Sequence, residues 1–406
     1  MSAALDQVPD AAADLPALLR RAGLGGVPTE EVAREGLRYF VNEFWTAGQR
    51  QAHRLHEISY RACFKPQLPA FFIAHLTAPG ASVYDPFSGR GTTALQAALM
   101  GRRPIASDIN PLAAMLLAPR LAPPTLDAVR VRLAALDLAR GGEGQDDPDL
   151  LAFFHPHTLR QIASLRGYLR ERAARGALDG VDAWVRMVAL NRLTGHSPGF
   201  FSVYTLPPNQ ATSAAAQRRI NAQRGQVPPP RDVAALILRK SRALLADGPP
   251  PPHPPARLLT CPAHDTPMLR DGEVDLIVTS PPFLDVVDYR GDNWLRLWFA
   301  GIEAASVPIA RHATPAAWEA FVRGAFASFA RVVRPGGIVA FEVGEVRGGR
   351  IALERHVAAA IAGLPFALIG VMLNRQRFTK TAQCWGVANN SGGTNSNRIV
   401  LARRLA

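Results

Sequence analysis

The chain has 406 residues, 48% of them hydrophobic, which is enough to bury one large core or two smaller ones. No apolar run reaches the roughly 20 residues that a membrane-spanning helix requires, and residues 1–14 lack the basic start and apolar centre of a signal peptide. The net charge of +13 comes almost entirely from arginine, which suits a polyanionic partner, although a GC-rich genome would also favour arginine. These properties favour a cytoplasmic protein without membrane contact.

The three cysteines, Cys63, Cys261 and Cys384, stand far apart in the sequence. None of them forms a pair with metal-ligand spacing, so neither a disulfide framework nor a zinc site is expected. We therefore expect no bound metal.

The first part of the chain alternates between helical and strand patterns. Residues 1–57 are predicted to form a helical segment, because apolar residues within 30–50 recur at helical spacing. Residues 82–85 and 104–108 have the pattern of short apolar strands, separated by a Gly-rich turn and a predicted helix over 92–100. This order is typical of the opening of a doubly wound, Rossmann-like sheet.

A long helical region separates this opening from a second set of strands. Residues 121–255 are mostly helical in pattern and end in a stiff Pro-rich stretch. Apolar strands are predicted after it, the last two as an antiparallel pair, over 257–260, 274–278, 337–343, 367–373 and 399–403. We expect an α/β fold with a helical segment at 1–57, a sheet core divided between 58–120 and 256–406, and a helical insert at 121–255.

A Gly-rich turn follows the first core strand. Gly89 and Gly91 allow a tight turn with close backbone approach to a ligand, and the helix after it offers unpaired N–H groups to an anion. A plain strand-to-helix turn has the same pattern, so the glycines alone decide little. The run consists of Asp85, Pro86, Phe87, Ser88, Gly89, Arg90, Gly91, Thr92 and Thr93.

Two acids follow neighbouring strands of the predicted sheet. Asp108 ends the strand over 104–108, where a carboxylate can accept hydrogen bonds from ribose hydroxyls or cap the next helix. Asp265 follows the strand over 257–260, where it could meet an adenine amino group or remain a solvated loop carboxylate. Both positions suit the ribose and base of a nucleoside-containing cofactor.

The strongest motif is Thr279-Ser280-Pro281-Pro282-Phe283, at the end of an apolar strand. The two prolines lack N–H donors and hold the chain extended, which turns carbonyls and the Ser280 hydroxyl towards a pocket. Acceptors placed this way can hold an exocyclic amine in line with a methyl donor, and Phe283 can stack on a flipped base. A rigid proline turn without function is the alternative. The loop contains no cysteine, which argues against carbon-5 methylation.

Together these motifs resemble the amino-group DNA methyltransferases, which make N4-methylcytosine and N6-methyladenine. The resemblance implies that residues 85–93 and 107–111 bind S-adenosylmethionine, with Asp108, Ile109 and Asn110 near its ribose. It also implies that the segment 58–69, with Lys65 and Pro66, closes over the methionine end of the cofactor, with Thr279 nearby. By the same resemblance Ser280 accepts from the target amine, and serine at this position favours cytosine N4.

The helical insert contains a polar stretch over 197–224 that we interpret as a DNA-contacting element. Arginine can read guanine or hold phosphates, and Asn or Gln can read adenine. A solvated helix face with a buried aromatic hinge is an equal alternative. The expected DNA contacts are Tyr204, Asn209, Gln210, Arg218, Arg219 and Arg224, with Tyr289 and Arg290 after the proline motif.

The sequence thus predicts base methylation in double-stranded DNA, cytosine N4 first and adenine N6 second. An RNA base methyltransferase and an inactive DNA-binding protein remain as alternatives. Such an enzyme would work in a prokaryotic cytosol or nucleoid, and it could have a restriction endonuclease partner. The sequence leaves open whether that partner exists, which site is recognised, and whether the protein is a monomer or a dimer.

Overall fold

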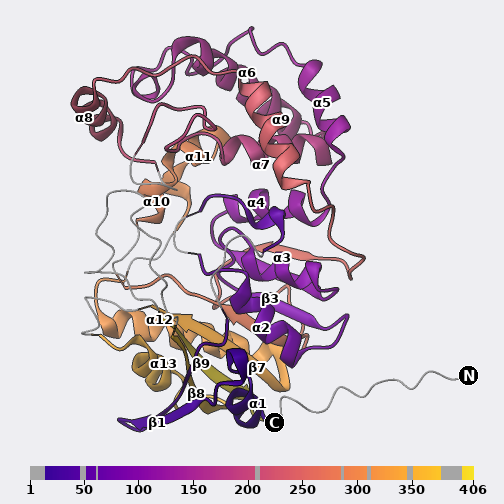
Figure 1. Cartoon of the computed structure of the whole chain (residues 1–406), viewed down its shortest axis with the longest axis vertical. Helices are drawn as coiled ribbons and strands as arrows, with labels where there is room; N and C mark the ends of the chain where they lie inside the picture. Colours follow the sequence, from indigo (N-terminus) through magenta and orange to yellow (C-terminus); the bar gives the residue numbers. More distant parts are fainter. Residues whose placement is uncertain are drawn as a thin grey trace, which may run out of the picture.

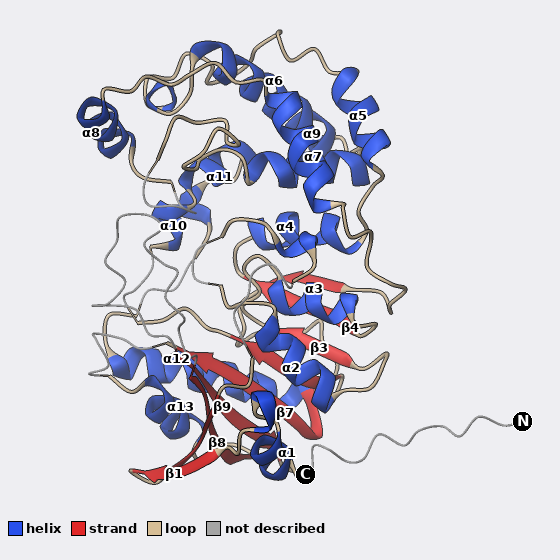
Figure 2. Ribbon diagram, in the orientation of Figure 1, coloured by secondary structure: helices blue, strands red, loops and turns tan. Residues whose placement is uncertain are grey.

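The computed structural model describes residues 14–45, 52–60, 63–205, 211–284, 288–308, 312–344, 351–375 and 396–406. A nine-stranded sheet and its covering helices form one end of the molecule, and a layer of helices forms the other (Figures 1 and 2). Within the described residues, no helix has both the length and the apolar character needed to cross a bilayer.

The sheet has the strand order β1-β2-β8-β9-β7-β6-β3-β4-β5. Strands β5, β4, β3, β6 and β7 run parallel, and β9 is antiparallel to both β7 and β8, so the predicted antiparallel pair is present. The strands are β1 (Glu30–Arg34), β2 (Leu37–Asn42), β3 (Ser82–Asp85), β4 (Arg103–Asp108), β5 (Arg257–Thr260), β6 (Val274–Thr279), β7 (Val333–Val343), β8 (Phe366–Arg375) and β9 (Ser396–Arg404).

The order in which successive strands are added to the sheet changes direction at β3. It adds β4 and β5 on one side of β3 and then, after the helical region, adds β6 and β7 on the other. Ligands of open α/β sheets bind at such a switch point, outside the carboxyl ends of the strands. The fold therefore directs attention to the ends of β6, β3 and β4.

The helix expected over 30–50 is wrong for its described first part, because residues 30–42 form a hairpin at the sheet edge, whereas residues 46–50 lie outside the described residues. Strands β1 and β2 are joined by Glu35 and Gly36, both with positive φ (49° and 81°), as a tight two-residue turn requires. β2 pairs with β8 and has buried side chains on both faces, and four of its six residues are apolar or aromatic. An apolar run of this kind also fits helical spacing, which explains the error.

Helices cover both faces of the sheet. One face packs against α1, α2 and α3, and the other packs against α12 and α13. The helices of this half are α1 (Leu15–Arg21), α2 (Gln67–Leu76), α3 (Thr92–Leu99), α4 (Leu112–Leu121), α12 (Pro315–Val332) and α13 (Leu353–Ile361).

The remaining helices share a separate apolar core, centred on the fully buried Trp184 of α7, whose indole N–H donates to Ser241 Oγ at 2.9 Å. This core also contains residues of α4 and of α11, which follows the proline motif, so the helical region is joined to both halves of the sheet core. Its helices are α5 (Leu126–Ala134), α6 (Pro156–Ala174), α7 (Gly180–Leu190), α8 (Ala214–Arg224), α9 (Val233–Leu244), α10 (Tyr289–Asp292) and α11 (Trp294–Ala300).

Candidate active site

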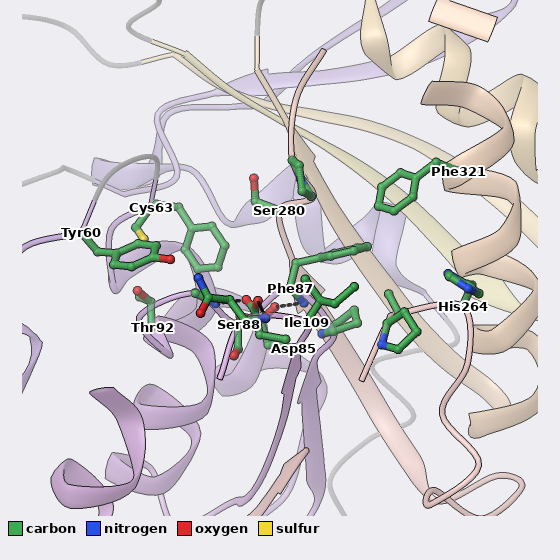
Figure 3. A pocket seen from close by; sticks show the side chains of 18 of the residues that line it. Tyr60, Cys63, Asp85, Phe87, Ser88, Thr92, Ile109, His264, Ser280 and Phe321 are labelled. Atoms are coloured by element: carbon green, nitrogen blue, oxygen red, sulfur yellow. Dashed lines mark hydrogen bonds between the residues drawn. The ribbon is translucent and has the colours of Figure 1, made fainter. Parts of the chain in front are cut away.

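Three polar side chains meet where neighbouring parallel strands end. Asp85 ends β3, Asp108 ends β4, and Ser280 directly follows β6. All three line one cavity of about 1070 Å³, part of it open to solvent (Figure 3). Polar groups that converge in one cavity at the ends of parallel strands are typical of a small-molecule site.

The turn after β3 has the backbone conformation that its glycines predicted. Gly89 and Gly91 have φ of 50° and 77°, and Gly91 is the residue before α3. A Cβ on Gly91 would lie 2.7 Å from Leu117 Cδ1, so a side chain would be both strained and obstructed there. The first turn of α3 follows directly, and Thr92 lines the cavity.

Asp108 links this turn to the tip of β4. Its carboxylate accepts hydrogen bonds from the backbone N–H of Gly89 at 2.8 Å and of Asn110 at 2.9 Å. The first N–H of α4, that of Leu112, donates to the Asn110 side chain at 3.0 Å and not to Asp108. Burial raises the pKa of Asp108 above its ordinary value of 3.8, while three backbone N–H donors oppose this shift. A carboxylate has about four lone pairs, so Asp108 can still accept from a ligand hydroxyl.

Asp85 is the second acid of the cavity. Its carboxylate accepts from the Thr279 hydroxyl at 2.6 Å and from Phe87 N at 3.2 Å. Burial raises its pKa to about 7, against the lowering effect of these hydrogen bonds. Thr279 is fully buried beneath the cavity, so its role is to hold Asp85 rather than to touch a ligand.

The described residues that line the cavity contribute negative charge to it. Asp85 and Asp108 are its acids, and no lysine or arginine lines it. His264, Phe87, Ile109 and Phe321 lie towards one end of the cavity, and Tyr60, Cys63 and Thr92 towards the other (Figure 3). A site of this kind favours an elongated ligand that has a flat apolar end and positive charge elsewhere.

The end of the cavity at Tyr60 and Cys63 is held by three arginines, of which Arg120 and Arg296 are buried. Arg90 donates to Ile58 O at 2.8 Å, Arg120 donates to Leu55 O at 3.2 Å, and Arg296 donates to Ser59 O at 3.1 Å. Burial lowers the pKa of Arg120 to about 9. These contacts tie the segment predicted to close over the cofactor to the Gly-rich turn and to the helical region.

Ser280 and Pro282 line the cavity, and the loop between them is braced from behind. The Trp318 indole N–H donates to the Pro282 carbonyl at 2.8 Å, which holds the loop in position and occupies one of the two lone pairs of that carbonyl. Phe283 does not line the cavity; its ring packs against Gly344, where a Cβ would lie 2.8 Å from Cε2. In this arrangement the Phe283 ring is not on the cavity lining, where it would have to lie for the stacking role that the sequence predicted.

Other expected contacts are also absent from the cavity lining. Asp265 is exposed, and its neighbour His264 lines the cavity instead. Thr93 is fully buried, and its hydroxyl donates to Val278 O at 2.9 Å, so it joins α3 to β6. The predicted residues that the structure places off the lining are Lys65, Pro66, Gly91, Thr93, Asp265, Thr279, Pro281 and Phe283, whereas Pro86, Ser88 and Asn110 are on it.

Glu342 is a residue of the site that the sequence motifs did not indicate. It lies on β7, one position after Phe341, which is in register with Thr279 of β6. The Ser280 hydroxyl hydrogen-bonds its carboxylate, and Asn397 Nδ2 donates to its Oε1 at 3.0 Å. Burial raises the pKa of Glu342 above its ordinary value of 4.5. The feature of the sequence that could have indicated this residue is a single acid inside the apolar strand predicted over 337–343.

The expected DNA-contacting residues have different environments. Arg218 pairs with Asp149 at 2.5 Å, and the Arg224 guanidinium lies over the Tyr204 ring, 4.1 Å from its centroid. Arg219 is exposed and has no partner among the described residues. Asn209 and Gln210 lie outside the described residues, as do the side chains of Tyr289 and Arg290.

Known proteins resemble the chain in part. Several solved structures share weak likeness with it, all with TM-scores below 0.5, and they add nothing to an assignment. They include a geranyl diphosphate methyltransferase with sinefungin (10% identity, 84% of this chain, 79% of that chain, TM-score 0.33). A Streptomyces coelicolor geranyl diphosphate C-methyltransferase has 12% identity over 70% of this chain and 100% of that chain, TM-score 0.21. A candidate DNA modification methylase of Thermus thermophilus has 18% identity over 34% of this chain and 50% of that chain, TM-score 0.21.

No curated protein matches the chain. Residues 27–116 match the model of the DNA methylase family that is named for N6 and N4 methyltransferases. The matched segment contains the Gly-rich turn and Asp108, and it ends before the helical region and before Ser280. Residues 27–116 therefore resemble the DNA methylase family, and the resemblance expected from the cofactor motifs is confirmed there.

Proposed function

We propose that the protein is an S-adenosylmethionine-dependent methyltransferase that acts on the exocyclic amine of a base flipped out of double-stranded DNA, with cytosine N4 as the favoured target. The observation that carries this proposal is the position of Ser280, which enters the same cavity as Asp85 and Asp108. A methyl donor and a target amine can therefore share one enclosed space.

The cavity fits S-adenosylmethionine in its charge. The cofactor carries a positive sulfonium and a positive ammonium, and it supplies a methyl group whose departure leaves a neutral thioether. Asp85 and Asp108 would face these positive and hydroxyl groups, and an arginine- and lysine-free lining avoids repulsion. Asp108 would accept from ribose hydroxyls, and the apolar end at Phe87, Ile109 and Phe321 would hold the adenine.

Ser280 would bind and orient the target. An exocyclic amine is a poor nucleophile because its lone pair is delocalised into the ring, so holding its N–H groups out of the ring plane raises its reactivity. The braced Pro281–Pro282 backbone would fix Ser280 for this purpose. Cytosine and adenine both present such an amine, so the choice of cytosine rests on the serine.

The helical region would contact the DNA through α8. Gln217 and Asn221 face inward and hydrogen-bond the backbone at Tyr204 and Ala152, so they hold the helix rather than read bases. Arg219 and Gln223 lie four residues apart on the exposed face, the spacing that places two side chains together on a helix. They are the side chains of α8 best placed to reach a base edge or a phosphate.

The test is to express the protein in cells, digest their DNA to nucleosides, and search for N4-methylcytosine and N6-methyladenine by mass spectrometry. Binding of S-adenosylmethionine is measured separately by calorimetry. N4-methylcytosine supports the proposal in full, and N6-methyladenine changes the target base alone. Cofactor binding with neither DNA product favours RNA as the substrate, and absence of cofactor binding favours an inactive DNA-binding protein.

A further inference from the structure

Glu342 lies directly behind Ser280, inside the sheet. The residues before Ser280 and Glu342 on the same sheet face, Val278 and Ala340, are fully buried. Glu342 itself is only 9% exposed, and its described partners are Ser280 and Asn397. An acid buried among apolar neighbours costs stability unless it has a task or strong partners. Neither of its partners here is charged, so the site calls for a functional explanation.

We propose that Glu342 holds the Ser280 proton, so that Ser280 offers only acceptor capacity to the target amine, and that Glu342 receives the proton which the amine loses. The proposal rests on the proposed function. It names the residue that determines whether Ser280 accepts a hydrogen bond from the target base or donates one to it.

The polarity argument follows from the donor count of a hydroxyl. A serine hydroxyl has one proton and two lone pairs. When its proton is donated to a carboxylate, the oxygen can only accept from a substrate, so it suits an amine. A base with a carbonyl in the same place would bring two acceptors face to face and leave both unpaired, which is costly in an enclosed site. The pair therefore selects amine-bearing bases over their carbonyl counterparts.

The same pair provides a route for the proton that must leave. When the nitrogen lone pair forms the new bond to the methyl carbon, the electron pair of the breaking C–S bond stays on sulfur and the nitrogen becomes positive. One N–H proton then moves to Ser280 Oγ while the Ser280 proton moves to the Glu342 carboxylate. The methylated amine is left neutral, the serine is unchanged, and Glu342 is a carboxylic acid that returns its proton to solvent after product release.

The pH dependence has a definite sign. The groups that act on the Glu342 carboxyl are Ser280 from β6 and Asn397 from β9, both neutral, and no described charged side chain contributes. Transfer requires the ionised carboxylate. Because burial raises the pKa of Glu342, activity falls as the pH decreases through that raised value, at a higher pH than for an exposed glutamate.

The first variant is Glu342→Gln, which keeps the size of the side chain. Its amide oxygen can still accept from Asn397, but its amide N–H group donates to Ser280. The variant therefore lacks the carboxylate that would accept the proton. The matched control is Glu354→Gln, the same change at a buried glutamate that lies in the first turn of α13 and pairs with Arg398 at 2.6 Å. Both are assayed with amplified, unmodified DNA and labelled S-adenosylmethionine between pH 5 and pH 9, with melting temperature and cofactor affinity measured in parallel.

We expect Glu342→Gln to lower kcat at saturating S-adenosylmethionine by about 100-fold or more, the range of positioned proton transfer. In an Asp85→Asn background, which removes the other carboxyl of the cavity that has a strongly raised pKa, Glu342→Gln should also remove the acidic limb of the pH profile. Cofactor affinity and the profile of Glu354→Gln should match the wild type. Ser280→Ala combined with Glu342→Gln should be no slower than Ser280→Ala alone. Retention of the acidic limb in a folded, cofactor-binding protein that carries both Asp85→Asn and Glu342→Gln overturns the inference, as does additive loss in the Ser280→Ala double variant.

Infrared spectroscopy supplies a readout that does not depend on turnover. On acidification, the wild type should gain the C=O band of a buried carboxylic acid that Glu342→Gln lacks, and Ser280→Ala should shift the pH at which it appears. A band that is the same in wild type and Glu342→Gln contradicts the inference. Wild-type protein without methyl transfer to any nucleic acid would instead remove the proposed function itself.

Discussion

The Gly89 N–H donates to the Asp108 carboxylate over 2.8 Å, so the Gly-rich turn after β3 and the tip of β4 are one unit. The acid that is expected to bind a ribose also sets the position of the turn that is expected to approach the cofactor. A change at Asp108 therefore affects cofactor binding in two ways, through a lost acceptor and through a displaced turn.

Asp108→Ala is expected to weaken S-adenosylmethionine binding by roughly 10-fold to 100-fold, because a hydrogen bond to a charged group contributes about 1.5–3 kcal/mol. Calorimetric titration of the purified variant measures this. Asp265→Ala serves as the control, since Asp265 does not line the cavity. Equal affinity in wild type and Asp108→Ala would show that neither the Asp108 acceptor nor its hold on the turn contributes to cofactor binding.

Ser280→Ala should lower methyl transfer by about 100-fold or more, because a positioned acceptor acts on the reacting nitrogen. Cofactor affinity should stay within about 2-fold, since the hydroxyl is directed at Glu342 and the target rather than at Asp85 or Asp108. Single-turnover kinetics and calorimetry separate these quantities. Loss of cofactor binding would place Ser280 in the cofactor site.

Gly91→Ala should lower the melting temperature more than Gly101→Ala. Both glycines have positive φ, 77° and 72°, but a Cβ on Gly101 meets nothing within 4 Å, whereas one on Gly91 meets Leu117 at 2.7 Å. Gly101→Ala thus measures backbone strain alone, about 1–3 kcal/mol, and Gly91→Ala adds a clash. Equal losses in differential scanning calorimetry would contradict the close approach of Leu117 to Gly91.

Arg219→Ala should weaken DNA binding more than Arg218→Ala, because Arg218 is engaged with Asp149 and Arg219 is not engaged with any described residue. If Arg219 holds a phosphate, the salt dependence of binding should lose a slope of about 1. Fluorescence anisotropy over a range of salt concentrations measures this. A larger loss with Arg218→Ala would transfer the contact to that residue.

The stability of the protein should depend on pH through Asp85. Burial raises its pKa from 3.8 to about 7, so the folded state keeps a proton that the unfolded state releases. This contribution to the free energy of unfolding is complete below pH 3.8 and is lost as the pH rises to about 7. Chemical denaturation of wild type and Asp85→Asn at pH 5 and pH 8 tests it: the difference between the two proteins should shift in favour of Asp85→Asn at pH 8.

Much of the core was predictable from local pattern. The strand over 257–260 matches β5 in both bounds, and the strands around Asp85 and Asp108 and the helix after Gly91 were also expected. The failure at β2 has a physical cause. A strand buried on both faces loses the alternation of polar and apolar residues, so its spacing no longer distinguishes it from a helix.

The sequence by itself determined the types of group in the site: acids after two strands, glycines where φ must be positive, and a serine before two prolines. These follow from short-range chemistry. Only the tertiary structure decided which of these groups enter the cavity. Whether a side chain points into the cavity or away from it depends on strand register and on packing across strands. The tertiary structure placed Thr279 beneath Asp85, packed Phe283 against Gly344, and brought Glu342 of β7 to Ser280 of β6, residues that are far apart along the chain.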